Sequence, residues 1–162
     1  MAREFSVPNQ LVPVALLAAA ADAAGRTSAY HSLKGAQKAW IVAHINQGNA
    51  AQVTLSPLQA TNVAGAGSKA IFAERIWLND ATASADALTL QTSLAATFQT
   101  DATLADKLII FEIEPEVAMD VANGFTSIAL QTSASNAANI TEALLLIYPR
   151  YQGADLINTL VN

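Results

Sequence analysis

Two segments of the chain repeat one pattern, in which apolar and polar residues alternate up to a short Asn-Ala-Ala sequence and alternate again beyond it. The first segment covers residues 40–58 and the second covers residues 127–148. A period of two residues is typical of β-strands, because successive side chains point to opposite faces of a sheet. Each segment therefore predicts two strands joined as a hairpin with a polar tip, and the chain is restricted to a fold rich in antiparallel strands.

The same period recurs along the rest of the chain. Further strands are expected at residues 70–78, 88–98 and 107–114, and the last of these, KLIIFEIE, alternates most clearly. The Asn123-Gly124 pair is a strong two-residue turn signal. No sustained helical period separates the strands, so a parallel α/β fold would lack its crossover helices. We expect an all-β fold, either an antiparallel β-sandwich or a jelly roll.

A chain of 162 residues fits one domain with terminal extensions. We predict an N-terminal arm and linker at 1–25, a sandwich domain at 26–151 and a short C-terminal tail at 152–162. Pro8 and Pro13 favour an extended arm over residues 1–13. The alanine-rich residues 14–24 fit either a short helix stopped by Gly25 or an extended segment.

Composition excludes several classes of function. The net charge is −5 and the chain has no cluster of Lys and Arg, so we expect no direct nucleic-acid binding. The apolar run at residues 12–21 is shorter than the roughly 20 residues that span a bilayer. Its nearly neutral leading segment and Pro13 are also unlike a secretion signal, so we expect a soluble protein. Because only 13% of residues are charged, the uncharged polar surface suits contact with other subunits.

Carboxylates gather at one place in the sequence, where Glu112, Glu114 and Glu116 are followed by Asp120. Paired acids can act in a glycosidase or hold Ca²⁺. A Ca²⁺ loop normally turns at a glycine, however, and a glycosidase needs an aromatic platform, whereas only 6% of this chain is aromatic. We interpret the cluster as a solvated strand end.

The other candidates for chemistry are isolated. His31 and His44 have no carboxylate or second histidine at metal-ligand spacing, and no G-x-S-x-G sequence is present. The Gly65-x-Gly67 sequence precedes a strand pattern instead of the helix that a dinucleotide site needs. We therefore predict a non-enzymatic protein without catalytic, cofactor-binding or metal-binding residues. Trp40 is expected in the core, whereas Trp77 fits a core or an interface almost equally.

Ten short segments, taken in order and spacing, resemble a family of small virion structural proteins of tailed bacteriophages. The resemblance covers residues 14–151. The segments are 20–27 (AADAAGRT), 30–34 (YHSLK), 47–51 (QGNAA), 58–61 (LQAT), 64–70 (AGAGSKA), 76–77 (IW), 111–113 (FEI), 120–125 (DVANGF), 135–139 (SNAAN) and 148–151 (YPRY).

This resemblance implies a place in a virion and no reaction. Within that family, the chain is most similar to a capsid decoration (cement) or minor capsid protein. The resemblance then implies that it binds the major capsid protein at the capsid surface, stabilises the head and self-associates as a homotrimer. Such a protein is made in the cytoplasm of the bacterial host. The alternatives are a neck or tail component and a carbohydrate-binding spike that contacts the host. Apolar residues in the two terminal segments are the candidate subunit contacts: Phe5, Val7, Leu11, Val12, Leu156, Ile157 and Leu160.

Overall fold

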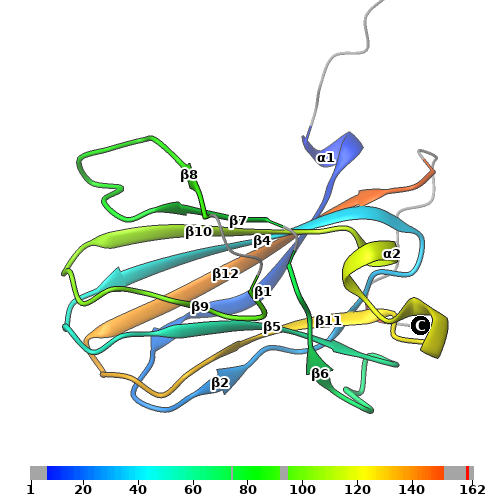
Figure 1. Ribbon diagram of the computed structural model, residues 1–162, viewed down its shortest axis with the longest axis horizontal. Coiled ribbons are helices and arrows are strands. Elements are labelled where there is room, and N and C mark those ends of the chain that lie inside the picture. The colour runs from blue at the N-terminus through cyan, green and yellow to red at the C-terminus, as the bar shows by residue number, and fades with distance from the viewer. Residues whose placement is uncertain (1–6, 74, 92–94, 152–159, 161–162) are drawn as a thin grey trace, which may run out of the picture.

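The computed structural model describes residues 7–73, 75–91, 95–151 and 160. Two six-stranded sheets pack face to face as an antiparallel β-sandwich, which confirms the expected all-β fold (Figure 1). Sheet A has the strand order β1-β12-β4-β10-β7-β8. Sheet B has the order β2-β11-β5-β6, and in addition β3 pairs with β11 and β9 pairs with β5.

The strands are short at the sheet margins and long at the centre. Their bounds are β1 Val12–Ala21, β2 Arg26–Thr27, β3 His31–Ser32, β4 Ala36–Gln47, β5 Thr54–Ala60, β6 Lys69–Ala70, β7 Arg75–Asn79, β8 Thr89–Leu90, β9 Phe98–Gln99, β10 Asp106–Ile113, β11 Ser127–Thr132 and β12 Asn139–Pro149. The helices are single turns, with α1 at Val7–Gln10, α2 at Pro115–Ala118 and the 3-10 helix η1 at Val121–Asn123.

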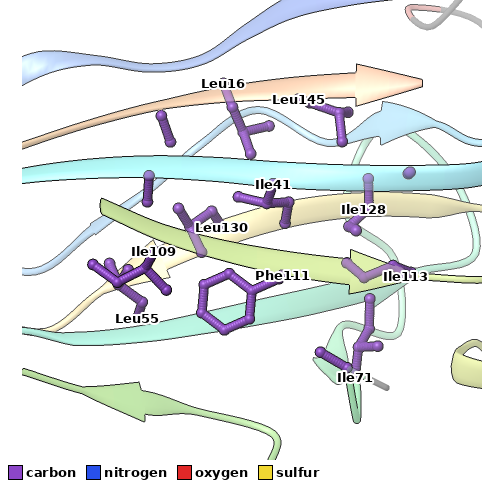
Figure 2. Close-up of a cluster of buried hydrophobic side chains, with 14 of the residues drawn as sticks. Leu16, Ile41, Leu55, Ile71, Ile109, Phe111, Ile113, Ile128, Leu130 and Leu145 are labelled. Atoms are coloured by element: carbon purple, nitrogen blue, oxygen red, sulfur yellow. The ribbon is translucent and has the colours of Figure 1, made fainter. Parts of the chain in front are cut away.

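The core lies between the sheets, and one alternate set of side chains from each long strand fills it. In β10, Ile109, Phe111 and Ile113 are fully buried, as their spacing predicts. Figure 2 shows Ile109 and Phe111 near Leu55 and Leu130 from sheet B, and Ile113 near Ile128 from the same sheet. Burying each large apolar side chain contributes roughly 1.5–3 kcal/mol to folding. Because the chain has no cysteine, the sandwich is held without disulfides, by packing, strand pairing and hydrogen bonds.

The two Asn-Ala-Ala segments are not hairpins, which corrects the prediction. Strand β4 lies in sheet A and pairs with β12 and β10, whereas β5 lies in sheet B and pairs with β11. Each segment is an arch that carries the chain from one sheet to the other: the first arch is residues 48–53 and the second arch is residues 133–138. Alternation fixes which side chains share a face, but it does not select the partner strand.

The N-terminal boundary also differs from the prediction. Residues 12–21 form β1, a ten-residue edge strand of sheet A that pairs with β12, in place of the arm and linker assigned to 1–25. The strand shows register shifts after Ala15 and after Leu17. Leu16 and Leu17 enter the core. Burial of these leucines and pairing with β12 outweigh the helix propensity of alanine. Within the arm itself, residues 7–10 form one helical turn.

Two expected strands are interrupted. Residues 70–78 divide into the end of β6 in sheet B and most of β7 in sheet A, so the chain changes sheets between them. Within 88–98 only β8 and the start of β9 are strands among the residues that the structure describes, and they too belong to different sheets. The Asn123-Gly124 turn closes η1, with Gly124 in the left-handed conformation at φ 82°.

Candidate functional site

The outer face of sheet A, which points away from sheet B, carries an apolar groove. Its floor is formed by half-buried side chains on three adjacent strands: Trp40 and Val42 from β4, Ile110 from β10, and Leu146 and Tyr148 from β12. These residues are neighbours because Trp40 pairs with Leu146 and Val42 pairs with Ile110. The central strand β4 has apolar residues on both faces, so one face contributes to the core and the other to the groove.

The walls of the groove come from elements near the chain termini. Gln10 and Leu11, at the end of α1, form one wall, and Glu116 and Val117 of α2 form another. Arg150 follows β12 at the rim. The groove encloses about 1030 Å³, which is at the upper end of the roughly 300–1,000 Å³ typical of ligand sites. The elements α1 and α2, which supply these walls, project at one end of the sandwich (Figure 1).

Glu114 and Glu116 of the acidic cluster line this groove, and Glu112 bonds to Trp40 on its floor, whereas Asp120 lies outside the groove lining. Glu112 lies 3.6 Å from Lys38 and 3.6 Å from Arg75. Lys38 also lies 3.8 Å from Glu114, and Arg150 lies 2.5 Å from Glu116. The cluster is therefore an ion-pair network that borders an apolar floor. Cross-strand pairing brings these bases together, and their sequence positions give no sign of it.

Trp40 is half-buried on the outer face, which corrects its predicted place in the core. Its Nε1 donates a 3.3 Å hydrogen bond to Glu112, and Lys38 Nζ lies 5.5 Å from its ring centroid. Trp77 is also partly exposed, and it pairs with Ile110 and Leu90 on the same sheet. Outward residues of central strands are apolar here, so the sequence pattern alone could not separate the two faces.

The histidines occupy different environments. His44 lies on the outer face of sheet A with Nδ1 3.2 Å from Glu142 and Nε2 4.0 Å from Asp106. The strand register thus gives His44 carboxylate neighbours that sequence spacing did not predict. His31 is buried in β3, its Nδ1 has no hydrogen-bond partner among the described residues, and desolvation lowers its pKa. The two rings lie in different sheets.

The two arches lock together at the opposite end of the sandwich. Asn139 is fully buried, and its side chain accepts from the Asn49 amide at 2.8 Å and donates to Ala51 O at 2.7 Å and to Ser135 Oγ at 2.9 Å. Ser135 Oγ also donates to Ala51 O. A Cβ on Gly48 would lie 2.6 Å from the carbonyl oxygen of Ala138, so this close approach requires glycine. We call this region the arch end.

A buried ion pair joins β1 to β12 beside the arches. Asp22 is fully buried, accepts from Thr141 Oγ1 at 2.5 Å and lies 3.3 Å from Arg26. The Arg26 guanidinium also donates to the carbonyls of Ala18, Ala20 and Thr141. These bonds cover part of the edge of β1, which protects the sheet from pairing with other strands.

Two further ion pairs fix loops to the sheets. Lys107 is 1% exposed and donates to Gln47 Oε1 at 2.9 Å and to the Asp101 carboxylate, and this bond lowers the pKa of Asp101. Lys69 donates to Asp120 at 2.5 Å, which lowers the pKa of that carboxyl as well. Lys69 Nζ lies 4.0 Å from the Phe125 ring centroid.

The predicted subunit-contact residues separate in the structure. Val7 in α1 is 43% exposed, Leu11 lines the groove and Leu160 is 69% exposed. Val12 pairs with Ile147 and packs against the core, so its predicted place in a free arm is wrong. Phe5, Leu156 and Ile157 lie outside the described residues.

Over the described ranges, no three His, Cys, Asp or Glu side chains gather closely enough to hold a metal ion. The helices found in that part of the chain are also too short or too polar to cross a membrane.

Comparison with known proteins finds one distant likeness. No family model matches the chain, and no curated protein matches it in sequence. Among solved structures, the fold is similar to the crystal structure of the SPBc2 prophage-derived protein YomS, with 6% sequence identity and a TM-score of 0.48 over 85% of this chain and 92% of that chain. A likeness at this level gives no information about function.

Proposed function

We propose that the protein is a non-enzymatic structural component of a tailed-phage particle, a decoration or minor capsid protein that binds the major capsid protein at the head surface and reinforces it. One observation carries the proposal: segments that resemble the phage family lie at the junctions of the fold. Residues 20–27 contain the Asp22–Arg26 pair, and residues 47–51 and 135–139 overlap the two arches. These junctions support a rigid body as the part of the protein that acts.

The ion pairs around the groove suit the polar border of an interface. Glu112 faces Arg75 and Lys38, and Glu116 faces Arg150. Their positions suit a polar rim around an apolar contact surface, which is the arrangement of a protein interface.

The proposal is tested by adding purified protein to empty heads assembled without it. Sedimentation with the heads, and a copy number that follows the capsid lattice, are expected. Failure to bind, or a copy number that fits a single ring at the neck or tail, would reject a decoration role. The N-terminal contact is tested by Val7→Asp, which should reduce head binding, with Val121→Asp as the matched control. The two valines are 43% and 44% exposed.

A second function, carbohydrate binding at the host surface, is favoured by one observation. Trp40 and Tyr148 line an open groove beside Gln10 and Gln37, and aromatic rings next to amide groups suit a sugar. A glycan array with Trp40→Ala as control tests this alternative. Saturable binding that Trp40→Ala abolishes would support it, and silence across the array would remove it.

A further inference from the structure

The groove on sheet A has no occupant in the described part of the chain, although both ends of the chain lie beside it. Gln10 and Leu11 form one wall and Arg150 forms part of the rim. The described chain therefore reaches the border of the apolar floor at Leu11 and again at Arg150. Covering this floor with another apolar segment is favourable, because it removes apolar surface from water.

The rim limits the chemistry of the occupant. Lys38, Arg75 and Arg150 each have a carboxylate within 4.0 Å, so a strongly charged ligand would have to break existing ion pairs. Gln10 and Gln37 offer amide groups that can bond to a peptide backbone. The groove therefore fits an extended peptide with several large apolar side chains and few charges.

We propose that this groove binds residues 152–162 of a second copy of the chain. The sequence QGADLINTLVN contains four large apolar residues and a single charge, Asp155. Eleven residues reach about 36 Å when extended, which is enough to cross from one subunit to the next. At the beginning of this segment Tyr151 is 81% exposed.

The course of the chain at Arg150 favours a neighbour over the chain's own segment. The Arg150–Glu116 pair separates the groove from a second hollow of about 300 Å³ that Leu33, Met119 and Tyr151 help to line. Tyr151 lies on the side of the second hollow and is absent from the groove lining. The described run 95–151 therefore ends outside the groove, which favours a segment from a neighbouring copy as the occupant.

This inference extends the proposed structural role by naming the contact through which copies associate. Its test uses purified full-length chains without capsids, so either proposal can fail while the other stands. Three proteins are compared by sedimentation equilibrium: the natural chain, a tail variant with Leu156→Ser and Ile157→Ser, and a groove variant with Val42→Glu. Leu104→Ser, at a position 61% exposed in a loop, is the control for the tail variant.

The natural chain and Leu104→Ser are expected to associate, and each tested variant alone should associate about tenfold or more weakly. Mixing the tail variant with the groove variant should restore association, because one partner keeps an intact groove and the other keeps an intact tail. A second groove variant, Leu146→Ser, guards against misfolding by Val42→Glu, and thermal melting verifies both. A natural chain that remains monomeric, a tail variant that associates normally, or a mixture that stays dissociated would overturn the proposal.

Discussion

The arch end and the groove face differ in where their polar and apolar groups point. At the arch end, Asn139, Ser135 and Asn49 bond to one another and to backbone groups. On the groove face, Trp40 and Leu146 leave apolar surface partly exposed, and the charges stand at the rim. A buried, fully hydrogen-bonded polar network increases the free energy of unfolding. Partly exposed apolar side chains instead make association more favourable, because a partner can cover them.

This comparison changes the meaning of the Asn-Ala-Ala segments. They were expected to be polar tips of hairpins, but the buried Asn139 side chain makes three bonds inside the molecule. The arches hold the two sheets in register. The face most suited to another polypeptide is the side of sheet A that carries the groove. Substitutions should accordingly reduce stability at the arch end and association at the groove.

The largest loss of stability is expected from Asp22→Ala at the arch end. The change leaves Arg26 and the Thr141 hydroxyl without their buried acceptor. Breaking a buried pair typically costs 3–5 kcal/mol, and we expect about 3 kcal/mol because the Arg26 side chain is 23% exposed. Urea unfolding measures it. A loss below about 1 kcal/mol would show that the pair does not hold β1 to the sheet.

Asn139→Ala should have the next largest effect. It leaves the Asn49 amide and the Ala51 carbonyl short of a partner in a buried site, at a cost of about 2 kcal/mol. Asn136→Ala is the control, since Asn136 Oδ1 bonds only the exposed backbone amide of Ala138 in the described structure and its removal should cost about 0.5 kcal/mol. Equal costs for the two substitutions would contradict the interlocking of the arches.

Leu146→Ser tests the groove face, where a substitution should reduce association more than stability. Leu146 is half-buried on the outer face, so its loss should reduce the free energy of unfolding by about 1 kcal/mol or less. Leu145→Ser, one position earlier, is the matched change on the core side and should cost about 3 kcal/mol or more, because Leu145 is fully buried. Thermal and urea unfolding of both variants measure the difference. Similar costs would mean that the two faces of β12 are equally buried.

The sequence predicted the faces of the long strands and failed on their partners. The alternation in β10 puts Ile109, Phe111 and Ile113 on one face, and the structure shows that this face is in the core. The same alternation could not show that β4 and β5 belong to different sheets, because period-two patterns are the same in hairpins and arches. The alanine-rich residues 14–24 fitted either a helix or an extended segment, and pairing with β12 selects the strand. These misses concern contacts between distant residues, which local propensity does not encode.

The candidate site was less predictable than the fold. Trp40 and Val42 lie on a central strand, where apolar residues are expected on both faces, so their sequence gives no sign of a groove. The acidic cluster was predicted as a solvated strand end, yet Lys38, Arg75 and Arg150 reach it from strands and loops far away in sequence. The burial of Lys107 could not be predicted from the sequence, because it depends on contacts with the Gln47 side chain and the Asp101 loop.

The smallest effect is the pH dependence of stability from Asp101. Because the bond from Lys107 lowers the pKa of Asp101 in the folded protein, the unfolded chain takes up this proton first as pH falls. The resulting stability is present above the ordinary carboxyl pKa and is lost as pH falls through the lower folded value. Asp101→Asn should therefore lower stability at neutral pH and flatten its decline below about pH 4. The Asp101 side chain is 56% exposed, so solvent screens it, and the buried Lys107 keeps Gln47 Oε1 and the Asp101 carbonyl as acceptors, which keeps this contribution small.

Urea unfolding at several pH values between neutral and acidic measures this slope, with Asp80→Asn in the loop after β7 as the control for loss of an exposed carboxylate. Asp120 also has a lowered pKa, from its bond with Lys69, and continues to titrate in both variants. The natural slope should therefore be reduced by Asp101→Asn but not removed. An unchanged slope would mean that the Lys107 contact does not favour the folded state, and the arch end would then owe its stability to neutral hydrogen bonds and the Asp22–Arg26 pair.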